Sequence, residues 1–219
     1  MWPALLDPLL PPACWSCRRP GGAGGALCPA CRAELCWLGP RASRHGDLDR
    51  AWAALAFDGP ARALVHALKF RGALGLARLM GDQVAARAPG GLLEPGTRIV
   101  PVPAHPGRAR RRGFDAAGLL AGAIAARSGL PVAHALRRED RGAGQRGAGR
   151  AERLQGARLG ITAEGRVDGP LLLIDDVWTT GATLQACAVA LRLAGAEAVS
   201  AVAYARVIRL PVPGDTIRV

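Results

Sequence analysis

The stretch of sequence that decides the fold begins as an apolar strand and ends in the first turn of a helix: Leu171-Leu172-Leu173-Ile174-Asp175-Asp176-Val177-Trp178-Thr179-Thr180-Gly181-Ala182-Thr183-Leu184. Its four consecutive aliphatic residues predict a strand that is buried on both faces, which is typical of a parallel sheet. Two carboxylates follow directly, and a short threonine and glycine loop leads into the helical pattern. Because ligands of open α/β sheets gather at the carboxyl ends of the strands, we expect a binding site here.

Outward from this stretch, strand patterns alternate with helical patterns. Strands are expected at 52–57, 99–102, 132–136, 171–174 and 198–205, and helices at 60–69, 73–87, 114–127 and 182–194. The strand–helix–strand order over 171–205 predicts a βαβ unit with a parallel pair of strands. The sequence therefore predicts an α/β fold with a parallel sheet flanked by helices.

The polar residues after the buried strand favour a particular ligand chemistry. Backbone amides of the loop 179–183, at the start of a helix, suit an anion such as phosphate. Asp175 and Asp176 suit hydroxyl groups or Mg²⁺. A ribose 5-phosphate offers both partners at once. The alternative is an aspartate-rich turn with a threonine that caps the helix.

The cysteines predict a metal site. Four of the six are spaced as two CxxC pairs, Cys14-x2-Cys17 and Cys28-x2-Cys31. Two such pairs complete the tetrahedron of a structural zinc ion. Two disulfides or an iron–sulfur cluster are the alternatives, and disulfides are disfavoured because residues 1–10 do not resemble a secretion signal. Of the remaining two, Cys36 is expected to be a packed thiol, with competition for the metal as the alternative, and Cys187 is expected to lie in the core.

Composition excludes several classes of protein. With 219 residues, 50% of them hydrophobic and 21% charged, the chain is not a disordered tail. Its longest apolar run, 116–126, is too short to span a bilayer, so we expect no membrane span. The net charge of +12 comes almost entirely from arginine and is compatible with nucleic acid, with phosphorylated metabolites or with a solvated surface.

The same patterns predict a division of the chain. Residues 1–37 are expected to form a small zinc ribbon, 38–50 a linker rich in polar residues, and 51–219 the α/β domain.

The stretch 171–184 resembles the phosphoribosyl pyrophosphate (PRPP) motif of the type I phosphoribosyltransferases. The resemblance implies a phosphoribosyltransferase-like fold in which the catalytic Asp175 and Asp176 hold the ribose hydroxyls. It also implies that the 5-phosphate is held by the loop that follows: Thr179, Thr180, Gly181, Ala182 and Thr183. Further segments, 57–62, 66–72, 100–103 and 108–115, are similar to the ComF competence-protein family, which also begins with a four-cysteine zinc ribbon. The resemblance implies a cytoplasmic location and an association with DNA uptake.

This resemblance implies an activity and its further residues. PRPP would bind with Mg²⁺, its pyrophosphate would lie against Arg108 and Arg112, and a flexible loop with Gln145 and Arg153 would close over it. Asp115 stands where the family usually has asparagine, which is a mild change. The loop lacks the family's threonine, at Gly142, and the asparagine that usually follows the arginine, which puts turnover in doubt more than binding. Nearby candidates are Lys69 and Arg71, whereas His66 and His105 are expected to be structural.

Three functions remain open at this stage. The first is a phosphoribosyltransferase that acts on an unknown acceptor. The second is a nucleic-acid-binding accessory protein of DNA uptake, which would act on single-stranded DNA or with the competence helicase machinery. The third is a sensor of PRPP or nucleotides without turnover.

Overall fold

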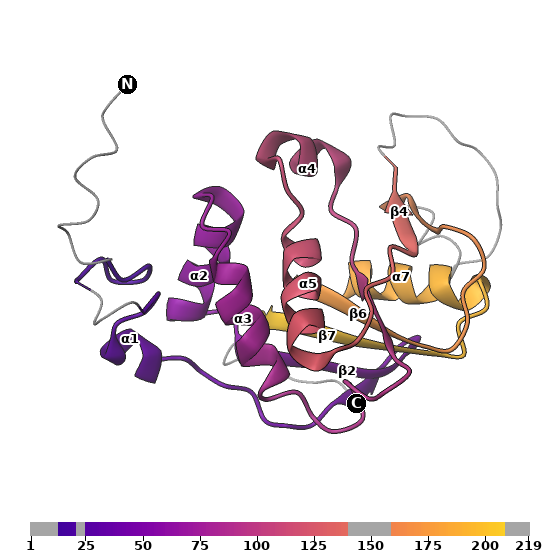
Figure 1. Cartoon of the computed structure of the whole chain (residues 1–219), viewed down its shortest axis with the longest axis horizontal. Coiled ribbons are helices and arrows are strands. Elements are labelled where there is room, and N and C mark those ends of the chain that lie inside the picture. The colour runs from indigo at the N-terminus through magenta and orange to yellow at the C-terminus, as the bar shows by residue number, and fades with distance from the viewer. Residues whose placement is uncertain (1–12, 21–24, 140–158, 209–219) are drawn as a thin grey trace, which may run out of the picture.

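A five-stranded, mostly parallel sheet forms the centre of the protein, as the computed structural model in Figure 1 shows. The structure describes residues 13–20, 25–139 and 159–208. The strands lie in the order β1 (Ser43–His45), β2 (Leu48–Ala56), β7 (Ala198–Arg206), β6 (Pro170–Trp178) and β3 (Arg98–Pro101). All neighbouring pairs are parallel except β1 with β2. The predicted α/β class with a parallel sheet is confirmed.

Helices cover both faces of this sheet (Figure 1). On one face lie α2 (Gly59–Phe70), α3 (Leu76–Ala85) and α5 (Ala116–Ser128), with α5 packed on β3 and β6. On the other face lie α7 (Ala182–Leu193) and a two-stranded antiparallel sheet of β4 (Leu136–Arg138) and β5 (Ile161–Ala163).

The apolar run of β6 contributes to two separate cores. Leu172 and Ile174 pack into the core shared with α2, α3 and α5, whereas Leu171 and Leu173 pack into the core shared with α7. All four side chains are 1% exposed or less. Successive side chains of a strand point to opposite faces, so only a strand covered on both faces needs an unbroken run of this kind.

The predicted βαβ unit is present as β6, α7 and β7. The strand is longer than the sequence pattern suggested, because its ladder with β7 continues through Asp175 and Val177 to Trp178. The two carboxylates are therefore part of the strand itself, and the loop after them is short.

Local signals explain where two of the helices begin. The carboxylate of Asp58 accepts a hydrogen bond from the amide of Gly59 at 2.7 Å, and α2 starts there. The carboxylate of Asp115 accepts from the amide of Ala117 at 3.1 Å at the start of α5, which ends at Gly129 in the left-handed conformation. Both helices cover the residues predicted for them to within two positions at each end.

Two segments differ from the sequence-based expectation. Residues 106–112, predicted only as an arginine-rich segment, form helix α4 (Pro106–Arg112), which is capped by the His105 side chain and ended by Gly113 at φ 78°. The strand predicted at 132–136 is a single bridge between Val132 and Ile99, and the regular strand β4 begins only at Leu136.

The segment predicted as a linker, 38–50, is largely built into the sheet, and for those residues the prediction is wrong. It contains β1 and the first residues of β2. The amide of Leu38 already donates to the carbonyl of Ala54 at 2.9 Å, and the amide of Ala56 donates to the carbonyl of Cys36. The chain thus joins the edge of the sheet immediately after the cysteine-rich module.

The cysteine-rich module, residues 13–20 and 25–37 of the described chain, shares its core with the rest of the protein. Its short helix α1 (Pro29–Ala33) follows Cys28. Leu27 and Leu35 belong to the same buried cluster as α2, α3 and α5. Within the described ranges, none of the helices combines the length and apolar character that a membrane crossing requires.

Candidate functional site

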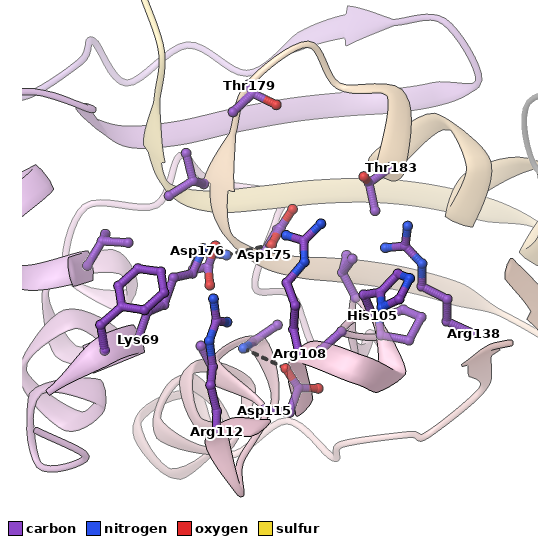
Figure 2. Close-up of a pocket in the computed structure, with 18 of the residues that line it drawn as sticks. Lys69, His105, Arg108, Arg112, Asp115, Arg138, Asp175, Asp176, Thr179 and Thr183 are labelled. Atoms are coloured by element: carbon purple, nitrogen blue, oxygen red, sulfur yellow. Dashed lines mark hydrogen bonds and ion pairs between the residues drawn. The ribbon is translucent and has the colours of Figure 1, made fainter. Parts of the chain in front are cut away.

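A cavity of about 380 Å³ opens at the C-terminal ends of β3 and β6, and Figure 2 shows the side chains around it. Residues from α2, α4, α5, β4 and the loop after β6 line it together. Its charged and polar lining consists of His66, Lys69, His105, Arg108, Arg112, Asp115, Arg138, Asp175, Asp176, Thr179 and Thr183. The structure therefore brings the predicted acidic pair and the predicted arginines into one cavity.

The two adjacent carboxylates have different partners because consecutive residues of a strand face opposite sides of the sheet. Asp176, 6% exposed, lies on the side of α2, where its Oδ1 is 2.6 Å from Nζ of Lys69. Asp175 lies on the side of the β4–β5 pair and α7, within electrostatic range of Arg138 and Cys187. Both carboxylates reach the same cavity.

Asp175 holds its proton more tightly than an ordinary carboxyl group. Burial, and after it the negative charge of Asp176, raises the pKa of Asp175 to about 7, although the positive charge of Lys69 works against this rise. The pKa of the neighbouring Asp115 is also raised, mainly by burial. A cluster of carboxyl groups of this kind gains from a cation or from hydroxyl donors placed between them.

Arginines form the opposite wall of the cavity (Figure 2). Arg108 and Arg112 come from α4, and Arg138 comes from β4. The Nε atoms of Arg112 and Arg138 are buried and have no hydrogen-bond partner among the described residues. Burial, and then the positive charge of Arg108, lowers the pKa of Arg138. Buried N–H donors without acceptors are costly, so this wall is suited to bind an anion.

The loop after β6 contributes only part of the predicted phosphate set to the cavity wall. Thr179 and Thr183 line the cavity. Thr180 is exposed and its Oγ1 accepts from the amide of Ala182 at 3.3 Å, so its hydroxyl caps the start of α7. Gly181 occupies the left-handed region at φ 83° and turns the chain into the helix.

Behind this loop, Trp178 and His45 pack tightly. Trp178 is 3% exposed, and its ring meets His45 edge-on with 5.0 Å between ring centroids. The guanidinium carbon of Arg206 lies 4.1 Å from the centre of the Trp178 ring. A Cβ atom added to Gly181 would lie 2.9 Å from ring nitrogens of both His45 and Trp178. Only glycine fits the loop here without a shift of these rings.

Several residues of the cavity were missed or misplaced by sequence reasoning. Arg138 lies in a polar stretch that was interpreted as a loop, although buried Leu136, exposed Arg137 and half-buried Arg138 alternate as a strand requires. His66 and His105 were expected to be purely structural, but both line the cavity.

Two further predictions concern residues near the cavity. Lys69 reaches it as proposed, whereas Arg71 is exposed and does not line it. Gln145 and Arg153, predicted in the flexible loop, lie outside the described residues.

A second site lies in the cysteine-rich module. The sulfur atoms of Cys14, Cys17, Cys28 and Cys31 all lie within 4.8 Å of one another, and all six cysteines are free of disulfides. Burial alone would raise the pKa of the Cys14 thiol, but hydrogen bonds from the amides of Cys17, Cys28 and Ser16 bring it down to about 6. Four gathered sulfurs, three of them buried, are the donor set of a closed structural Zn²⁺ site.

The two remaining cysteines lie outside this cluster. Cys187 is buried in the core, as expected. Cys36 is exposed, so the expectation of a packed thiol is wrong; its backbone pairs with β2, which leaves its side chain at the surface.

Comparison with known proteins supports the zinc module. A comparison with curated proteins finds no match to the chain. Residues 5–48 match the family model of the double zinc ribbon domain. Together with the geometry of the four sulfurs, this match identifies the N-terminal segment as a four-cysteine zinc ribbon. Its four sulfurs are the ligands expected for a structural Zn²⁺ ion.

Proposed function

We propose that the cavity binds PRPP with Mg²⁺ and that the protein is a phosphoribosyltransferase-like member of the ComF type. In this proposal the carboxylates of Asp175 and Asp176 hold the ribose hydroxyls and the magnesium ion. Arg108, Arg112 and Arg138 hold the pyrophosphate. Thr179 and Thr183, with the amides at the start of α7, hold the 5-phosphate.

One observation carries this proposal. The buried carboxyl group of Asp176 and the half-buried one of Asp175 face two buried guanidinium Nε atoms that lack partners among the described residues, across one cavity at the ends of parallel strands. A ligand with hydroxyl groups at one end and phosphate groups at the other satisfies both sets. A simple phosphate would leave the carboxyl groups without a partner beyond Lys69, and a neutral sugar would leave the arginines unpaired.

The charges of the cavity agree with a reaction at the anomeric carbon. Departure of pyrophosphate builds negative charge on the leaving group, which the arginines and the magnesium ion would neutralise. The acceptor's nitrogen attacks the anomeric carbon while the bond to pyrophosphate breaks. Lys69, held beside Asp176, lies close enough to the acidic pair to orient it.

Isothermal titration with PRPP and MgCl₂ tests the binding step. The wild-type protein should bind, and Asp175→Asn combined with Asp176→Asn should not. Arg138→Met should weaken binding about tenfold or more, since a hydrogen bond to a charged group is worth about 1.5–3 kcal/mol. Arg127→Met, at an exposed arginine of α5 away from the cavity, is the matched control. A wild-type protein that fails to bind PRPP would refute the proposal.

A second assay separates catalysis from sensing. If PRPP binds, release of pyrophosphate is measured in the presence of a panel of amines and nucleobases. Release that depends on one acceptor supports transfer. Binding without release for any acceptor favours a sensor of PRPP.

A nucleic-acid interface is the second candidate, and helix α4 favours it. Arg108, Arg110 and Arg111 are all exposed on this short helix. Single-stranded DNA with a fluorescent label tests this candidate. Affinity should fall steeply as salt rises if the helix binds phosphate groups of the backbone, and a flat response would exclude it.

A further inference from the structure

One wall of the cavity is aromatic, although the chain has few aromatic residues. Phe57 and Phe70, two of its three phenylalanines, line the cavity together with His66. The ring centroids of Phe57 and His66 are 6.5 Å apart in a stacked arrangement, and those of His66 and Phe70 are 5.4 Å apart. We call Phe57, His66 and Phe70 the aromatic rim.

Two of the three residues of the aromatic rim are exposed, whereas Phe57 is half-buried and packs against the core. Phe70 is 58% exposed, and His66 is also exposed. Leaving a large apolar ring in water is unfavourable, so exposure beside a cavity marks a surface that a ligand can cover.

Helix α2 fixes the rim next to the acidic pair. His66 and Phe70 are four residues apart, so they lie on one face of the helix. Lys69 on the same helix reaches Asp176 at 2.6 Å. A group bound against Phe70 is therefore close to a sugar held by Asp175 and Asp176.

Arg112 joins the rim to the anion-binding wall. Its guanidinium carbon lies 4.7 Å from the centre of the Phe70 ring, and its buried Nε has no partner among the described residues. Flat, weakly hydrated guanidinium groups and aromatic rings are the two surfaces against which planar heterocycles stack in proteins. The guanidinium group of Arg112 and the rings of the aromatic rim thus line the same cavity.

We propose that the aromatic rim binds a planar heteroaromatic ring, so that the cavity accommodates such a ring beside the phosphorylated sugar. This inference rests on the proposed function, because the sugar site places the ring. In this inference, Phe57, His66 and Phe70 make the protein select a planar co-substrate over an aliphatic amine.

Comparison of ribose 5-phosphate with AMP and UMP tests this inference, because the nucleotides add only the ring to the same sugar phosphate. In isothermal titration the wild-type protein should bind AMP more tightly than ribose 5-phosphate, by about 5- to 150-fold, the range expected for stacking of one base. UMP, with a smaller ring, should fall between the two.

Variants of Phe70 test whether its ring causes the tighter binding of AMP. In Phe70→Ala the ratio of the two affinities should fall towards one, and Phe70→Trp should keep it. Leu193→Ala, at an exposed residue of α7 on the other face of the sheet, is the matched control and should retain the wild-type ratio. Circular dichroism of each variant checks that it folds.

The outcomes separate this inference from the proposed function. If ribose 5-phosphate binds and AMP binds no better, the inference is overturned while the sugar site stands. If Phe70→Ala keeps the wild-type ratio, the ring lies elsewhere and the inference is again overturned. If neither ligand binds, this inference is overturned, and the titration with PRPP and MgCl₂ decides separately whether the proposed function stands.

Discussion

Replacing Asp175 with asparagine should stabilise the folded protein, and the gain should grow with pH. Its carboxyl group has a pKa of about 7 in the folded protein, against an ordinary value of 3.8. Between these two values the unfolded chain has lost this proton while the folded protein keeps it. The free energy of unfolding of the wild type therefore falls as pH rises through this window. The asparagine variant has no carboxyl proton to release, so its free energy of unfolding does not fall for this reason.

The magnitude follows from the pKa. At about 1.4 kcal/mol for each pKa unit, the full difference approaches about 4 kcal/mol above pH 7. Because the cavity admits water, which screens the charge, we expect about 2–4 kcal/mol. Roughly half of this difference develops between pH 5.5 and pH 8, so the gap between variant and wild type should widen by about 1–2 kcal/mol over that range.

Urea denaturation followed by tryptophan fluorescence measures this gap at several pH values. The zinc site also depends on pH, but its contribution cancels when wild type and variant are compared at each pH. Glu197→Gln, at an exposed carboxylate, is the control and should show no trend. A gap for Asp175→Asn that stays constant from pH 5.5 to pH 8, or that narrows, would refute the reasoning.

Three further predictions concern packing and the metal. Gly81→Ala should lower the free energy of unfolding by about 1–3 kcal/mol in urea denaturation, because the added Cβ would lie 2.5 Å from a side chain of α5. The control, Gly122→Ala, adds its Cβ in open space on α5 and should not destabilise the protein. Equal changes in the free energy of unfolding for the two variants would contradict this account. Gly181→Ala should cost at least about 1 kcal/mol in the same assay and weaken PRPP binding, because it strains the loop and displaces the rings behind it; unchanged stability would argue against the described loop. Metal analysis should find one zinc per chain in the wild type and in Cys36→Ser but less in Cys31→Ser, and equal zinc in both variants would exclude the assigned ligands.

The buried parts of the sheet could be predicted because their sequence pattern reflects their surroundings directly. The run Leu171–Ile174 is apolar throughout because both faces of β6 are covered. The acidic pair could be placed at the end of the sheet because it follows this apolar run directly in β6. The zinc ligands could be predicted from the spacing of the cysteines alone, because two CxxC pairs complete a tetrahedral zinc site without ligands from elsewhere in the fold.

Other parts of the site depend on contacts that no local pattern records. Helix α4 has no buried residue, so it shows no apolar periodicity; its limits are set by His105, Pro106 and Gly113. Arg138 reaches the cavity because β4 pairs with β5, which lies more than twenty residues later in the chain. The aromatic rim is formed only when the end of β2 meets α2.

Lys69 is the only lysine of the chain. Its amine lies on the wall of the cavity, 2.6 Å from Asp176 and partly open to solvent. The protein thus carries one lysine side chain for amine-selective chemistry, and it lies at the site. The extent to which a reagent modifies this group, read by mass spectrometry, reports how far the cavity is filled without any label being introduced.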